Sequence, residues 1–100
     1  MIRRRQGRDD EVIVDPNDLD LPAKPRVVRI RAEPYVDCAG EDALEVWLVM
    51  ADSTSEKHMD FHHVEPIRDR VREHLRDEGD DRWPYFRVRT VSEMRRRRRA

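Results

Sequence analysis

Residues 43–51 read ALEVWLVMA, the most apolar run of the chain, and the predicted fold is built around this segment. Only Glu45 interrupts the apolar residues. A strand that is covered on both faces shows such a nearly continuous apolar run, because neither face meets water. The run is also short enough for a single strand. We therefore predict that residues 43–51 form the central strand of a sheet.

Two further segments alternate apolar and polar residues, which is the pattern of a half-buried strand. They are RVVRIRA at residues 26–32 and WPYFRVRTV at residues 83–91. Between the first of these strands and the central one, we expect residues 33–42, EPYVDCAGED, to form a hairpin loop. Residues 11–15, EVIVD, could add an edge strand. The face toward the core would carry Val28, Ile30, Ala32, Leu44, Val46, Leu48, Met50, Phe86 and Val88.

A helix is expected between the second and third of these strands. Val64, Ile67, Val71 and Leu75 recur at spacings of three and four and form a single apolar stripe. We expect Pro66 in the first turn, where its missing N–H costs nothing. Asp60 would cap the helix if it starts early, and Gly79 would end it in a left-handed turn.

These elements predict an α+β fold, a two-layer sandwich of order ββαβ. One helix would pack on a small sheet of three strands, or of four if residues 11–15 take part. We divide the chain into a flexible charged arm (1–25), an α+β domain (26–92) and a basic tail (93–100). In a chain of 100 residues only one domain is expected.

Charge is unevenly distributed, although the net charge is only −1. Residues 9–20 hold six acids and no base, whereas both ends are rich in arginine. An acidic body disfavours a domain whose whole surface follows nucleic acid. No apolar run is long enough to cross a membrane, and no secretory signal is visible. The single Cys38 excludes an internal disulfide, so we expect a cytoplasmic protein without a membrane partner.

One helix covers one face of the sheet, so the opposite face should be open. An exposed surface of arginines and aromatics is typical of a contact site. Three interpretations compete: a protein interface, which includes a homodimer packed sheet to sheet; an RNA surface; or cover by the acidic residues 9–20 of the same chain. The predicted binding residues are Arg29, Arg31, Trp47, Tyr85, Arg87 and Arg89.

The chain ends in a run of five arginines, Arg95, Arg96, Arg97, Arg98 and Arg99. Such a run attracts RNA, DNA or an acidic protein without sequence specificity, and the attraction falls with salt. The alternative is a solvated end that only adds solubility. We favour an electrostatic role because blocks of like charge at termini are often interaction tails.

The segment KHMDFHHVEP, residues 57–66, contains three of the four histidines. The spacing of these histidines is not the His-Glu-x-x-His pattern of a zinc protease. The three or four ligands that zinc needs are also not all present, so we expect no metal. Cys38 has no histidine close in sequence and is a poor candidate nucleophile. No phosphate loop, dinucleotide motif or nucleophile elbow is found, so we expect neither a cofactor nor a catalytic residue, and more likely no enzyme.

From the sequence we therefore expect a small cytoplasmic binding or adaptor protein. It would be a homodimer that uses the arginine and aromatic face of its sheet. The alternative is an RNA- or DNA-associated protein that uses the same face together with the terminal arginine runs.

Overall fold

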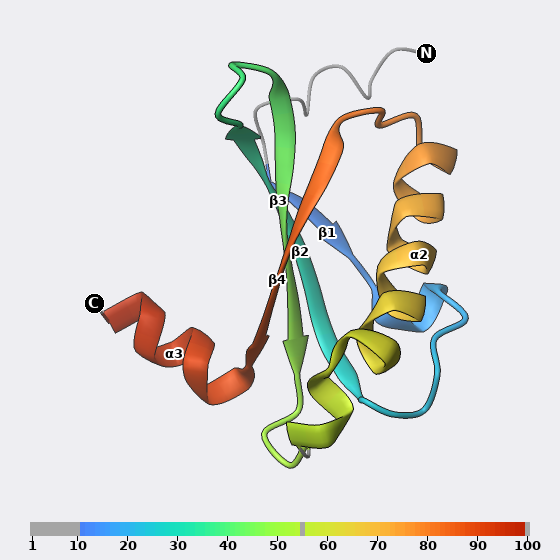
Figure 1. The fold of residues 1–100 in the computed structure, drawn as a ribbon, viewed down its shortest axis with the longest axis vertical. Coiled ribbons are helices and arrows are strands. Elements are labelled where there is room, and N and C mark those ends of the chain that lie inside the picture. The colour runs from blue at the N-terminus through green and yellow to red at the C-terminus, as the bar shows by residue number, and fades with distance from the viewer. Residues whose placement is uncertain (1–10, 55, 100) are drawn as a thin grey trace.

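The computed structural model describes residues 11–54 and 56–99 (Figure 1). The basic segment at residues 1–8 and the start of the predicted arm lie outside this range. The described chain forms one four-stranded sheet with one long helix against it. In chain order the elements are β1 (Val12–Val14), η1 (Pro16–Asp18), β2 (Val27–Val36), β3 (Asp42–Met50), η2 (Glu56–Met59), α2 (Phe61–Asp77), β4 (Trp83–Thr90) and α3 (Val91–Arg99).

The strands lie in the order β1-β2-β3-β4, and the sheet is mixed. β1 and β3 are antiparallel to β2, whereas β4 is parallel to β3. The predicted class, a small α+β domain with one main helix, is confirmed. The predicted ββαβ layout of three strands is only roughly right, since β1 adds a fourth strand at the edge. The central position of β3, between β2 and β4, is confirmed.

The main core lies between α2 and one face of the sheet. The stripe predicted for α2 is confirmed, because Val64, Ile67, Val71 and Leu75 are all buried. They meet Leu44, Val46, Leu48 and Met50 of β3 together with Ile30 and Ala32 of β2. Val14 of β1 also belongs to this core, so the short edge strand is held by packing as well as by pairing.

Both predicted ends of α2 are confirmed. The Asp60 carboxylate accepts a hydrogen bond from the His63 backbone N–H at 3.1 Å, and Gly79 has a φ of 86°. The prediction for Pro66 was wrong: α2 begins at Phe61, so Pro66 lies in the second turn rather than the first. There its missing N–H leaves the His62 carbonyl without its usual helical donor.

Two predictions for β2 also need correction. The strand continues to Val36, so the hairpin loop is only residues 37–41. Pro34 is tolerated because β1 pairs only with residues 30–32, which leaves β2 at the sheet edge beyond them. A register shift between Val27 and Arg29 exchanges the predicted faces of two valines. Val27 packs against the core, whereas Val28 is 37% exposed.

α3 lies on the side of the sheet opposite α2 (Figure 1), and this helix was not predicted from the sequence. Val91, predicted to end the last strand, is the first residue of this helix. Thr90 and Glu93 form a reciprocal capping box. The Thr90 N–H donates to Glu93 Oε1 at 2.8 Å, and the Glu93 N–H donates to Thr90 Oγ1 at 3.2 Å. No helix in the described part of the chain is long and apolar enough to cross a membrane. The division into arm, domain and tail stays a prediction.

Candidate interaction surface

The face of the sheet opposite α2, called the open face below, is organised in rows that cross the strands. In the row at its centre, Arg31 of β2 lies beside Trp47 of β3, which lies beside Arg87 of β4. All six predicted binding residues lie on this face. Its members are Ile13, Arg29, Arg31, Glu33, Tyr35, Glu45, Trp47, Val49, Tyr85, Arg87 and Arg89.

Trp47 is not exposed, which corrects the expectation of a bare tryptophan. It is only 5% exposed and Val49 is fully buried, because Met94 and Val91 of α3 pack over them. The Arg89 guanidinium lies 5.5 Å from the centre of the Trp47 ring, a cation–π distance. Trp47, Val49 and Met94 thus form a second, smaller core, and Trp47 is a structural residue of this face.

Two of the predicted arginines have carboxylate partners within the chain. Arg31 pairs with Glu11 of the acidic segment and with Glu33 at 3.4 Å. Arg87 donates from Nε to Glu45 at 2.9 Å, across β3 and β4. Exposed pairs of this kind contribute about 0–1 kcal/mol each, so they orient the arginines more than they stabilise the fold.

Tyr85 and Arg29 complete the predicted set, and both are exposed. The Tyr85 hydroxyl donates to Asp37 Oδ2 at 3.0 Å, and its ring lies edge-on to Tyr35 with 5.6 Å between centres. The bond to Asp37 raises the pKa of Tyr85. The Glu41 backbone N–H, and to a lesser extent the Tyr85 hydroxyl, lower the pKa of Asp37. The hairpin loop thereby fixes the direction of the Tyr85 ring.

Cover of the open face by the acidic segment is slight within the described residues. Glu11 reaches Arg31, but Asp15 instead caps η1. Asp20 lies 3.8 Å from Arg70, on α2 and therefore on the other side of the sheet. Residues 9 and 10 lie outside the described range, so their part in the predicted cover is not tested.

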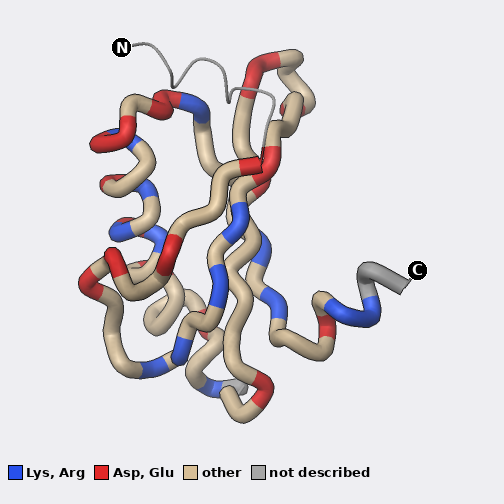
Figure 2. Tube along the Cα trace, turned by 180° about the vertical axis from the view of Figure 1, so that it is seen from behind, with Lys and Arg blue, Asp and Glu red and all other residues tan. Residues whose placement is uncertain are grey.

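The arginine run begins within α3. Arg95 and Arg96 are exposed. The preceding residue, Met94, packs against Val49, which lies between Arg29 and Arg89 in the sheet. Figure 2 shows basic segments in the strands of the sheet and again in α3. The side chains of the remaining arginines, 97–99, lie outside the described set.

The anchoring of α3 is the feature that the sequence reasoning missed. Asp52, at the end of β3, accepts from both the backbone N–H and the hydroxyl of Ser92, at 2.9 and 2.7 Å. These bonds lower the pKa of Asp52. The sequence did contain a signal, because Thr90-Val-Ser-Glu93 has the spacing of a capping box. Asp52 had no such signal, since it meets Ser92 only through the fold.

His62 and His63 lie in the first turn of α2, His58 lies in η2, and His74 lies in the last turn of α2. His63 Nδ1 is 2.7 Å from Asp60 Oδ1, and the His58 and His63 rings are 5.0 Å apart. Burial, followed by the neighbouring charge of His63, lowers the pKa of His58. Within residues 11–54 and 56–99, no group of three or more His, Cys, Asp or Glu residues is placed to hold a metal ion.

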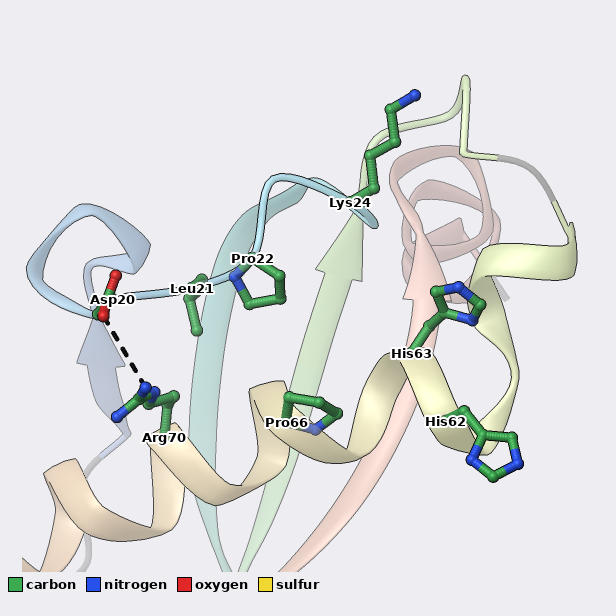
Figure 3. A pocket seen from close by; sticks show the side chains of 8 residues that line it. All are labelled: Asp20, Leu21, Pro22, Lys24, His62, His63, Pro66 and Arg70. Carbon is green, nitrogen blue, oxygen red and sulfur yellow. Dashed lines mark ion pairs between the residues drawn. The ribbon is translucent and has the colours of Figure 1, made fainter.

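His62 and His63 line an open pocket of about 420 Å³ between α2 and the segment before β2 (Figure 3). Lys24 and Arg70 also line it, so the pocket is rich in cations. Their charges are partly neutralised, because Arg70 lies 3.8 Å from Asp20 and 3.6 Å from Glu73. We assign no ligand to this pocket.

No known protein family matches this sequence, and neither a curated protein nor a solved structure is significantly similar to it.

Proposed function

We propose that this protein is a small binding module that works as a homodimer, with the exposed part of its arginine and aromatic face as the contact. One observation carries the proposal. Tyr85 and Arg87 stay exposed on β4, an edge strand, after α3 has covered Trp47. Tyrosine and arginine are enriched among the residues that dominate binding energy. A cytoplasmic location is part of the proposal and rests on the use of a single cysteine.

Sedimentation velocity on the full-length chain over a wide concentration range tests self-association. We expect a species of twice the chain mass, and at least a tenfold weaker association when Tyr85 and Arg87 are both replaced by alanine. Trp47 is unsuitable for this test because it belongs to the core of the face. Val36→Ala, at a side chain that is 64% exposed elsewhere, is the matched control. A wild-type chain that stays monomeric at every concentration contradicts the proposal.

A second function, association with RNA or DNA, is favoured by one specific observation. α3 carries the exposed Arg95 and Arg96 and packs through Met94 on Val49, which lies between Arg29 and Arg89 in the sheet. Arginine side chains that neutralise phosphates release counterions, so binding would weaken steeply with salt. Fluorescence anisotropy with a labelled single-stranded RNA at low and moderate salt measures this slope. Arg95→Gln with Arg96→Gln should flatten it, and salt-independent binding would count against phosphate contacts.

A further inference from the structure

β4 is an edge strand, and three observations show which of its backbone groups point outward. Pro84 lacks an N–H, the Val88 carbonyl accepts from Arg89 Nη1 at 2.8 Å, and the Thr90 N–H donates to Glu93. The Val88 carbonyl and the Thr90 N–H therefore bond to side chains, of Arg89 and Glu93, and not to β3 in these two contacts. The N–H and C=O of one residue point the same way in a strand, and neighbours alternate. The even-numbered residues of β4 therefore turn their backbone groups away from β3.

The two edges of the sheet differ in what they offer to a further strand. β1 is three residues long, whereas β4 runs over eight residues from Trp83 to Thr90. In the described part of the chain, β3 is the only strand that pairs with β4. A long edge of this kind is a ready template for another chain, and added strands gain main-chain hydrogen bonds.

We propose that a second copy of this chain pairs its β4 antiparallel to β4, with the twofold axis at Phe86. This inference rests on the proposed homodimer and names the contact that forms it. Phe86 then faces Phe86 of the second copy, and Tyr85 faces Arg87 in both directions. At the ends of the pairing, Pro84 faces Val88 and Trp83 faces Arg89. The two sheets become one of eight strands, with both open faces on the same side.

The backbone hydrogen bonds fit this register. Phe86 lies among the outward-pointing residues, so two Phe86 residues exchange both of their N–H···O bonds across the axis. Each Val88 N–H donates a hydrogen bond to the Pro84 carbonyl of the other copy. The Val88 carbonyl would meet no donor, since Pro84 has no N–H, but the Arg89 guanidinium of its own chain already donates to it at 2.8 Å. Every outward group from Pro84 to Val88 is satisfied.

The side chains also select this register over its neighbours. Cross-strand pairs of arginine with an aromatic ring are favourable, whereas like charges directly opposite each other are not. Moving the axis to Arg87 would place two arginines face to face. Moving it to Tyr85 would bring Pro84 opposite Phe86 and lose a central hydrogen bond. Only the axis at Phe86 pairs Arg87 with Tyr85 in both directions. The Trp83 ring lies 6.0 Å from the Arg72 guanidinium of α2 and takes no part in this selection.

Charged side chains near the twofold axis do not prevent the two copies from coming together. Arg68 and Arg72 of α2 lie over the Phe86 ring, at 5.2 and 5.4 Å from its centre. Their charges are offset by Glu65, which is 3.5 Å from Arg68 and 3.4 Å from Arg72, and by Asp69, which is 2.8 Å from Arg72. Further out, Thr90 falls opposite Arg82 of the second copy. The basic helix α3 therefore starts beside the acidic turn that precedes β4, at residues 77–81.

A mixed disulfide tests this register directly. In a full-length Cys38→Ser background, one preparation carries Tyr85→Cys and a tagged one carries Arg87→Cys. These positions form a non-hydrogen-bonded pair, whose Cα separation of about 4.5 Å suits a disulfide. We expect mild oxidation of the mixture to link the two proteins at least tenfold faster than it links either protein to itself. Val36→Cys mixed with either protein is the control and should give little product.

A charge substitution and its exchange provide an independent test. Tyr85→Arg puts an arginine opposite Arg87 twice, so association should weaken at least tenfold. Tyr85→Arg combined with Arg87→Tyr restores both pairs in exchanged order and should return association to within about threefold of wild type. Val36→Arg is the matched control for added charge.

The outcomes separate this inference from the proposed function. A mixed disulfide together with rescue by the exchange supports the β4 contact. If the wild-type chain dimerises, but the cysteine variants form no mixed disulfide and Tyr85→Arg associates as strongly as wild type, the β4 contact is wrong and self-association remains. A wild-type chain that sediments as a monomer at every concentration overturns both.

Discussion

The two faces of the sheet are covered in different ways. Under α2 the side chains of Leu44, Val46, Leu48 and Met50 of β3 are fully buried, and four apolar residues of α2 pack against them. On the open face Trp47 and Val49 are buried under Val91 and Met94 of a short basic helix, and the small side chain of Ala43 is buried as well. The rest of the open face includes the ion pairs of Arg31 and Arg87, the rings of Tyr35 and Tyr85, and the exposed Ile13 and Arg29. The first face holds the main core of the fold, whereas much of the second stays polar and exposed to solvent.

The covered face should be the more sensitive of the two to loss of side-chain volume. Ile67→Ala removes a fully buried side chain at the centre of α2 and should lower the free energy of unfolding by about 2–5 kcal/mol. Urea unfolding followed by circular dichroism measures the change. A loss below about 1 kcal/mol would mean that α2 does not pack on the sheet as described.

The open face should respond less to a similar deletion. Met94→Ala should cost about 1–3 kcal/mol, because α3 can shift to close part of the cavity. It should also expose Trp47 and shift its fluorescence to longer wavelength. The measurement is made in a Trp83→Phe background, so that Trp47 is the only tryptophan. An unchanged emission maximum would show that α3 does not cover Trp47.

The capping box of α3 predicts a smaller effect. Thr90→Ala removes the hydroxyl that accepts from Glu93 and should cost about 0.5–2 kcal/mol. Urea unfolding measures the loss, with the exposed Ser53→Ala as the control. If the two variants are equally stable, the cap does not hold α3 in place.

The smallest expected effect is a pH dependence that comes from Asp52. Its pKa in the folded chain lies below the ordinary value of 3.8, because Ser92 donates two hydrogen bonds to it. The stabilisation is therefore complete above pH 3.8 and is lost as the pH falls through the lower pKa of the folded state. The difference in unfolding free energy between wild type and Asp52→Asn should shrink over that interval. A difference that stays constant down to pH 2.5 would exclude a role for the carboxylate charge.

The comparison of the two faces also shows what could be predicted from the sequence. The stripe from Val64 to Leu75 and the run at residues 43–51 predicted α2, β3 and the core between them. The period of two also placed all six predicted binding residues on one face. The reversal at Val27 and Val28 could not be predicted, because a bulge depends on how two strands pair and has no signal in one strand alone.

The burial of Trp47 illustrates the same limit on the open face. α3 has only two apolar residues that reach the sheet, so its sequence has no periodic apolar stripe from which the helix could be predicted. Its place depends on a capping box and on Asp52, which is forty residues away in the chain. Sequence patterns report contacts between near neighbours, whereas this contact exists only after the sheet has formed.

Local patterns in the sequence were enough to predict the class of fold, the central strand, the main helix with its caps and the face on which the arginines gather. These follow from hydrophobic periodicity and local capping, which act within a few residues. The burial of Trp47, the pairing of Arg31 and Arg87 with particular carboxylates and the position of β4 at an edge of the sheet become visible only in the tertiary structure. Those features depend on strand order and register, and only the pairing of distant segments fixes them.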